Sequence, residues 1–209
     1  RDVERSRGLG DVYKRQIGVA DGMGLSISCD INYRKNLWQY GKSAEEVLLP
    51  LMEYSDIVFG SAGEYEKALG IKAPAFGAKN ADAEVDTELF GNYCADVSRR
   101  LPRCKHMFVC LRNVMTTEHH TIAGVLYSGG RLFATRVYEI NNVIDSMGVG
   151  DAFVGAMLYA FQNYDGDQAK LDFATAGAVL KNTVVGDYNM VTTDEVEALI
   201  KGGNAEMRR

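Results

Sequence analysis

Apolar residues along the chain follow two kinds of spacing, and each kind predicts a different element. In 25–33 they alternate with polar residues, and in 56–60 and 106–111 they form short, nearly uninterrupted runs. Alternation and short apolar runs are typical of β-strands. Two further apolar runs within 121–140 are joined by Ser-Gly-Gly, a junction that predicts a β-hairpin. These segments are the expected strands of one sheet.

Elsewhere the apolar positions recur every three or four residues, which is the spacing of an amphipathic helix. Several of these stretches begin with a Ser or Thr that is followed three residues later by Glu, the pattern of a capping box. Strands that alternate with helices predict an α/β fold with a doubly wound, mainly parallel sheet flanked by helices. The segments expected to be helical are 42–55, 61–70, 83–101, 150–163, 167–185 and 193–201.

The beginning of the chain follows neither pattern. The segment 1–16 has no helical stripe, no alternation and no starting Met, and it resembles translated adapter or vector sequence. We therefore expect residues 1–16 to be a non-native or disordered leader that has no role in the fold. Residues 17–209 then form the folded region, which is long enough for one domain with a sizeable core.

The bulk composition excludes some classes of partner. The chain has 46% hydrophobic residues, 24% charged residues and a net charge of −5, so it is globular in type and poorly suited to bulk electrostatic binding of nucleic acid. No apolar run reaches the length of a membrane span, and no membrane partner is expected. The cysteines lack C-x-x-C spacing, which predicts reduced core thiols and a cytoplasmic location. These cysteines are Cys29, Cys94, Cys104 and Cys110.

A glycine-rich stretch stands where the predicted helix 150–163 begins. Gly148, Val149, Gly150 and Asp151 precede a long apolar run. Free backbone N–H groups at a helix start, with the positive end of the helix dipole behind them, stabilise an anion. A carboxylate beside such an anion hole can accept a proton from an attacking hydroxyl. The alternative is a tight turn followed by an aspartate that caps the helix.

The same stretch resembles the C-terminal signature of the ribokinase-like (PfkB) sugar kinases. The segment 145–158, DSMGVGDAFVGAML, is similar to D-T-x-G-A-G-D-x-F-x-x-G and departs from it by a Ser for Thr and a Val for Ala. The resemblance implies that Asp151 is the catalytic base. It also implies that Gly148, Val149 and Gly150 line the anion hole and contact the nucleotide phosphates.

A second motif resembles one branch of that family. The segment 29–38, CDINYRKNLW, is similar to the strand-end motif of the 2-keto-3-deoxygluconate kinases. The resemblance implies that Arg34 contacts the sugar acid and the nucleotide phosphates, and that Asn32 and Tyr33 lie on the nucleotide side. A guanidinium holds carboxylate or phosphate by paired hydrogen bonds. A surface salt bridge is the alternative role for Arg34.

Further segments extend the resemblance with departures from the family pattern. GDYNMV implies that Asp187 contacts the sugar, although a simple turn is the alternative. CLRNVMT stands in place of the family's R-G-x-x-G nucleotide loop, so Arg112 and Asn113 are assigned to the nucleotide. SAGE stands in place of N-x-x-E, which links Glu64 to magnesium, although a capping box with Ser61 explains the same pair.

Taken together, the resemblance covers about 17–201 and implies the C-terminal portion of a kinase whose lid region is missing. It implies ATP and Mg²⁺ as cofactors and phosphorylation of 2-keto-3-deoxygluconate to its 6-phosphate, with activity of the fragment itself left open. The alternatives are another sugar or nucleoside kinase of the family, a catalytically dead nucleotide- or metabolite-binding module, and an α/β interaction domain. A homo-oligomer of the full-length parent is also left open.

Overall fold

A computed structural model describes residues 2–202, with side chains from residue 12 onward. Its centre is one sheet in the order β1-β2-β3-β4-β5, with β6 paired to the far end of β4. The first three strands pair in parallel, and β4 runs antiparallel to β3, β5 and β6. The strands are β1 (Ser28–Asp30), β2 (Ile57–Ser61), β3 (His106–Val114), β4 (His120–Ser128), β5 (Arg131–Ala134) and β6 (Tyr138–Ile140).

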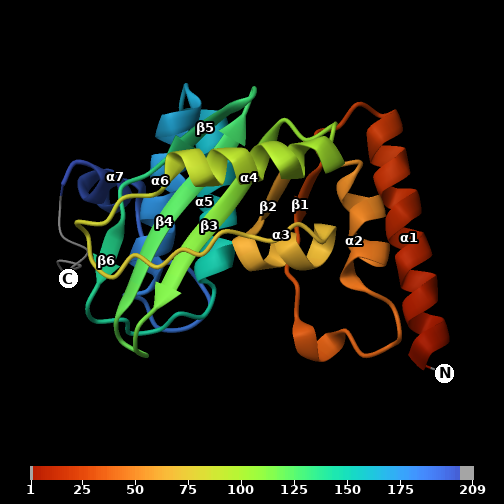
Figure 1. The fold of residues 1–209 in the computed structure, drawn as a ribbon, viewed down its shortest axis with the longest axis horizontal. Helices are drawn as coiled ribbons and strands as arrows, with labels where there is room; N and C mark the ends of the chain where they lie inside the picture. Colours follow the sequence, from red (N-terminus) through yellow and green to blue (C-terminus); the bar gives the residue numbers. More distant parts are fainter. Residues whose placement is uncertain (1, 203–209) are drawn as a thin grey trace.

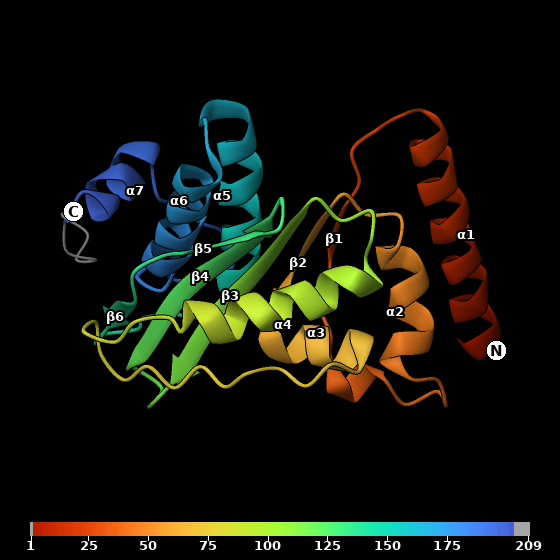
Figure 2. The same ribbon diagram turned by 45° about the horizontal axis from the view of Figure 1, so that its top comes forward.

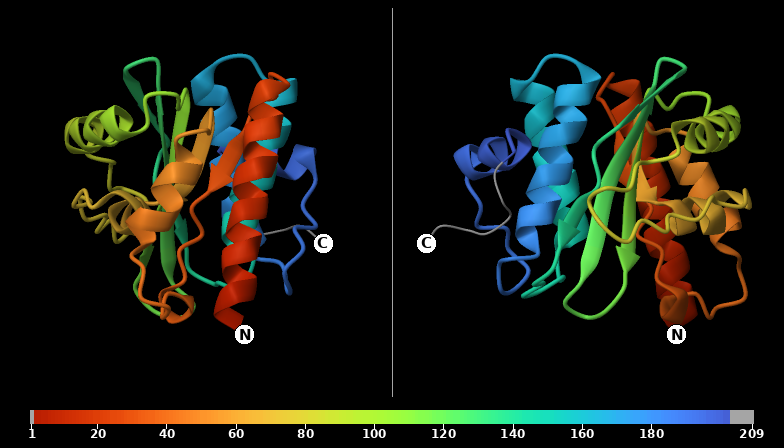
Figure 3. Two further views of the ribbon diagram at one scale, coloured as in Figure 1. Left: turned by 90° about the vertical axis from the view of Figure 1, so that its right-hand side faces the viewer. Right: turned by 60° about the vertical axis from the view of Figure 1, so that its left-hand side comes forward.

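Helices cover both faces of this sheet (Figure 1, Figure 3). The helices α2, α3 and α4 lie on one face, and α5, α6 and α7 lie on the other, so the predicted α/β sandwich is confirmed. No helix within residues 2–202 combines the length and apolar character of a membrane span. The helices are α1 (Asp2–Gly22), α2 (Ala44–Met52), α3 (Ala62–Leu69), α4 (Thr87–Arg100), α5 (Val149–Asn163), α6 (Asp167–Lys181) and α7 (Thr193–Ile200), with a 3-10 turn at Lys35–Leu37.

The central strand β3 shows how the sequence builds the two layers. Successive side chains of a strand point to opposite faces, and in β3 Met107 and Val109 join the core under α3 and α4. Phe108, between them, joins the core under α5 and α6 and stacks on Phe59 of β2 with ring centroids 5.1 Å apart. Both faces of the strand are therefore buried, which explains its nearly continuous apolar run.

The main departure from the sequence prediction lies at the beginning of the chain. Helix α1 spans Asp2–Gly22, whereas the sequence pattern predicted no helix or strand in this segment. The helix lies outermost, beside α2 and beyond the β1 edge of the sheet (Figure 2). From residue 12 to its end its side chains are partly or fully exposed, and Asp21 pairs with Arg103. The non-native origin of 1–16 stays a prediction.

One close approach fixes how α6 sits on the sheet. Gly124 of β4 faces Thr175 of α6, and a Cβ on residue 124 would overlap the Thr175 hydroxyl oxygen and lie 3.0 Å from Leu171 Cδ1. Thr175 is fully buried, and its hydroxyl donates to the Leu171 carbonyl at 2.9 Å. Thr175 therefore serves the contact between helix and sheet.

We expect Gly124→Ala to lower the free energy of unfolding by about 1–3 kcal/mol, the usual range for overpacking a core. Urea unfolding measures this loss. Thr175→Ala removes the overlapping hydroxyl, so the double variant Gly124→Ala with Thr175→Ala should recover part of the lost stability. Gly91→Ala is the matched control, because its added Cβ has no neighbour within 4 Å and alanine favours the helix. A Gly124→Ala variant as stable as the parent and as Gly91→Ala would contradict the packing argument.

Candidate active site

A cleft of about 730 Å³ opens at the carboxyl ends of β1, β2 and β3. The starts of α3 and α5 form its walls, and Pro74 and Phe76 from the irregular segment before α4 add an apolar side. Open α/β sheets bind ligands at this edge, outside the carboxyl ends of the strands. The cleft is therefore the place where the topology expects a ligand.

The start of α5 presents its free amides to this cleft. Gly148 occupies the N-cap with φ of 73°, a left-handed conformation, and it carries no side-chain cap. Gly148, Val149, Gly150 and Asp151 all line the cleft. A Cβ at residue 150 would have no neighbour within 4 Å, so the backbone there is open to a ligand. Among the described residues no side chain caps this helix, which argues against the reading of Asp151 as a simple cap.

Arg34 and Glu64 lie on the opposite wall, from the end of β1 and the start of α3. Arg34 Nη1 is 3.6 Å from Glu64 Oε1, and the Arg34 side chain remains 63% exposed. Glu64 also accepts from the Ser61 backbone N–H at 2.8 Å and closes the predicted capping box. The capping alternative for Glu64 is thus present in the structure, while its second oxygen faces the cleft arginine. An exposed pair of this length contributes little stability, so Arg34 is available to an anion.

Asp30 is a cleft residue that the sequence motifs did not single out. It ends β1 and lines the cleft, and its Oδ1 accepts from the Asn32 N–H at 3.3 Å. Partial burial, then the carboxylates of Glu64 and Asp151, raise the pKa of Asp30 above its ordinary value. The only available signal was its position, a polar residue directly after a strand at the carboxyl edge of the sheet.

Asn32 and Tyr33 line the same cleft. Asn32 adopts φ of 44°, which is uncommon for a residue other than glycine, and this bend turns the chain out of β1. The Tyr33 ring packs on Trp38, with centroids 5.6 Å apart, and Trp38 packs in turn on Tyr40 at 5.8 Å. The motif 29–38 therefore forms one wall of the cleft.

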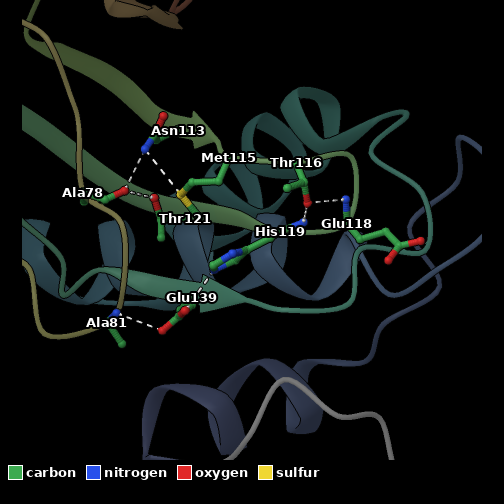
Figure 4. A network of polar contacts seen from close by, with 9 residues as sticks. All are labelled: Ala78, Ala81, Asn113, Met115, Thr116, Glu118, His119, Thr121 and Glu139. Atoms are coloured by element: carbon green, nitrogen blue, oxygen red, sulfur yellow. Dashed lines mark hydrogen bonds and ion pairs between the residues drawn. The ribbon is translucent and has the colours of Figure 1, made fainter.

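The β3 end contributes Arg112 to the cleft but not Asn113. The Asn113 amide donates to the Ala78 carbonyl at 2.9 Å, and the Thr121 hydroxyl donates to the same oxygen at 2.7 Å. Nearby, Glu139 accepts from the Ala81 N–H at 3.2 Å (Figure 4). Asn113 thus anchors the segment before α4, and its predicted contact with nucleotide is not supported by its placement.

Asp187 meets the anion hole through its backbone rather than its side chain. The side chain is exposed and does not line the cleft. The Asp187 carbonyl oxygen lies where a Cβ on residue 148 would stand, so only glycine fits at that position. The predicted contact of the Asp187 side chain with the sugar is therefore not supported by its placement.

Cys110 also lines the cleft, and burial raises the pKa of its thiol to about 11. A thiol that stays protonated is a poor nucleophile. The chemistry of this cleft therefore falls to its carboxylates, arginines and amides.

Two carboxylates of the cleft, Asp30 and Glu64, are candidate ligands for Mg²⁺. Among residues 2–202 no three His, Cys, Asp or Glu side chains form a closed metal site. Magnesium bound with nucleotides needs only one or two carboxylates, because phosphates and water complete its shell. Asp30 and Glu64 lie close enough for Glu64 to raise the pKa of Asp30, so this pair fits such a shared site.

Comparison with known proteins agrees with this geometry. Residues 15–194 match the sequence profile of the pfkB family of carbohydrate kinases. The chain belongs to this family. A 2-dehydro-3-deoxygalactonokinase of Haloferax volcanii is 28% identical over 91% of the chain and 52% of the relative. A 5-dehydro-2-deoxygluconokinase of Lacticaseibacillus casei is 22% identical over 90% of the chain and 51% of the relative.

Solved structures place this pfkB family chain on the same fold. The 2-dehydro-3-deoxygluconokinase of Thermotoga maritima superposes with a TM-score of 0.80 at 28% identity, over 93% of the chain and 55% of that protein. The fructokinase of Xylella fastidiosa, solved with bound ATP, superposes with a TM-score of 0.61 at 20% identity, over 92% of the chain and 56% of that protein. The chain thus spans about half the length of the curated relatives it matches.

We expect the two glycines of the pfkB signature to respond differently to alanine. Gly148→Ala should destabilise the chain by at least about 1–2 kcal/mol, the cost of a left-handed alanine, because its Cβ also overlaps Asp187. Gly150→Ala should leave unfolding unchanged, because no atom lies within 4 Å of its added Cβ. Urea unfolding of both variants checks this, and equal destabilisation would contradict the described loop contact.

We expect Asp30→Asn to raise the unfolding temperature at neutral pH. A carboxyl whose pKa is raised by folding destabilises the native state when it is charged, and this penalty disappears as the pH falls below its ordinary pKa. The gain should therefore shrink between pH 7 and pH 4 in thermal unfolding. Asp165→Asn, at an exposed position before α6, is the control that should show no such gain. A gain that persisted in acid would contradict the electrostatic origin.

Proposed function

We propose that this chain carries the phosphoryl-transfer site of an ATP-dependent kinase that converts 2-keto-3-deoxygluconate to its 6-phosphate. The observation that supports this best is the convergence of Asp151, the open amides of α5 and the two arginines Arg34 and Arg112 on one cleft. An anion hole opposite cations fits a ligand that carries several negative charges. Membership of a carbohydrate kinase family makes a nucleoside triphosphate the natural candidate for this ligand.

In this proposal Asp151 is the general base. Its carboxylate accepts the proton of the C6 hydroxyl while that oxygen forms a bond to the γ-phosphorus. The bond between the γ-phosphorus and its bridging oxygen breaks, and ADP leaves with that electron pair. The amides of Val149 and Gly150 stabilise the negative charge that develops on the transferring group, because they are already oriented by the helix.

Charged side chains around the cleft position the reactants. Arg34 and Arg112 hold phosphate or carboxylate oxygens, since a guanidinium offers several donors in a fixed plane. Asn32 and Tyr33, which line the cleft, contact the nucleotide in this proposal. Mg²⁺, when bound, neutralises the β- and γ-phosphate oxygens, and Asp30 and Glu64 are the side chains that would hold it.

A keto-deoxy sugar acid is the substrate class that the relatives favour. The curated relatives named above act on 2-dehydro-3-deoxygalactonate and 5-dehydro-2-deoxygluconate by their names, and Arg34 suits the carboxylate of such a substrate. The role proposed for Asp187 toward the sugar rests on the segment GDYNMV alone. A catalytically dead binding module is the second candidate, because the chain spans only about half of these relatives.

The decisive variant is Asp151→Asn in the full-length parent enzyme. If Asp151 is the base, turnover of 2-keto-3-deoxygluconate should fall by about 10²–10⁴, the usual contribution of a positioned acid or base. Binding of ATP, measured by calorimetry, should change little because the amides remain. Unfolding should also change little, since no side chain caps α5.

Asp165→Asn is the matched control, because this exposed carboxylate lies between α5 and α6 away from the cleft. An Asp151→Asn enzyme with the parent's turnover would overturn the mechanism. A parent that binds ATP but phosphorylates neither 2-keto-3-deoxygluconate nor a related sugar acid would favour the binding module instead.

A further inference from the structure

Two loops meet behind the anion hole, and one side chain joins them. The first loop, 141–148, leads into α5, and the second, 182–191, follows α6. Asp145 Oδ1 accepts from the Met147 N–H at 2.9 Å within the first loop. Asp145 Oδ2 accepts from the Gly186 N–H at 2.8 Å in the second loop. Both carboxylate oxygens are thus used, one for each loop.

Residues at the C-terminal end of α6 hydrogen-bond to both loops. The Asn182 carbonyl accepts from the Ile144 N–H at 2.8 Å and from the Asp145 N–H at 3.2 Å. Lys181 is fully buried, and its Nζ donates to the Val184 carbonyl at 3.0 Å. A buried ammonium needs compensating negative charge or dipoles nearby. The second loop is thus attached both to Lys181 and to Asp145.

Lys181 and Asp145 also interact electrostatically. The hydrogen bonds from Met147 and Gly186, with the charge of Lys181 in addition, hold the pKa of Asp145 below its ordinary value. Asp145 is therefore charged near neutral pH. Each of its oxygens accepts one backbone N–H, from Met147 and from Gly186, so the charged group ties the two loops together.

The anion hole depends on the relative position of these loops. Gly148 is the N-cap of α5, and a Cβ on it would overlap the Asp187 carbonyl oxygen, so the second loop lies directly against the start of the helix. The Gly186 N–H that Asp145 binds is one residue away from that contact. A shift of the second loop would therefore be transmitted to the first amides of α5.

We propose that Asp145 is a positioning residue of the anion hole: its carboxylate holds the loops 141–148 and 182–191 in register. The inference rests on the proposed function for its consequence in catalysis, but the clamp itself is a property of this chain. Asparagine cannot replace it fully, because an amide has one acceptor oxygen, and its NH₂ group would face an N–H donor.

Hydrogen exchange of the 209-residue chain tests the clamp without reference to catalysis. We expect the Gly186 and Met147 amides of the parent to exchange more slowly than those of exposed turns, and Asp145→Asn to speed the exchange of at least one of them about tenfold or more. Lys181→Met removes the Nζ that holds the Val184 carbonyl of the second loop and should also speed exchange at Gly186. Asp165→Asn is the control that should leave both rates unchanged. Unaltered exchange in Asp145→Asn would overturn the clamp.

A kinetic readout separates positioning from mere stability. In the full-length enzyme, Asp145→Asn should lower kcat by about 10²-fold, because small misplacement of catalytic groups has effects of that order, while KM for the sugar changes little. Asp145→Asn with the parent's kcat would overturn the positioning role even if exchange changed. If the parent itself fails to bind ATP in calorimetry, the proposed function fails, and faster exchange in Asp145→Asn still supports the clamp.

Discussion

A missing side chain at residue 148 is the constraint on which the site depends. The loop after α6 lies against the backbone of Gly148, in space that any other residue would fill with its Cβ. Gly148 also holds the left-handed conformation that starts α5 toward the cleft. Two loops from distant parts of the chain can therefore share one helix start. The free amides of that start, with Asp151 in the first turn, face the carboxyl ends of three parallel strands.

Much of the fold could be predicted because its signals are local. The apolar run of β3 and the glutamates three residues after Ser61 and Thr192 specify elements by periodicity and by short hydrogen bonds. The helical character of 2–22 escaped prediction because the segment has no apolar stripe, and its described side chains are accordingly not buried. The Ser-Gly-Gly turn predicts the hairpin of β4 and β5, whereas the reversal between β3 and β4 lies in the connection 115–119, which contains no glycine or proline.

The site could be predicted in part. Gly148, Gly150 and Asp151 are close together in sequence, so the start of one helix fixes their relative positions. The placements of Asn113 and Asp187 could not be predicted, because a single position in a motif does not tell which neighbour its polar atoms will meet. Asn113 binds Ala78 instead, and Asp187 contributes its backbone. Asp30 was missed because its neighbours Glu64 and Asp151 are distant in sequence and meet it only in the folded chain.

The aromatic wall of the cleft gives the protein an optical property. Trp38 is the only tryptophan in the chain, and its ring packs on Tyr33, which lines the cleft. Excitation at the red edge of the absorption band selects this single indole over the tyrosines. A ligand that displaces water from Tyr33 or turns its ring changes the surroundings of that indole. The emission of Trp38 is therefore a built-in, label-free reporter of what occupies the cleft.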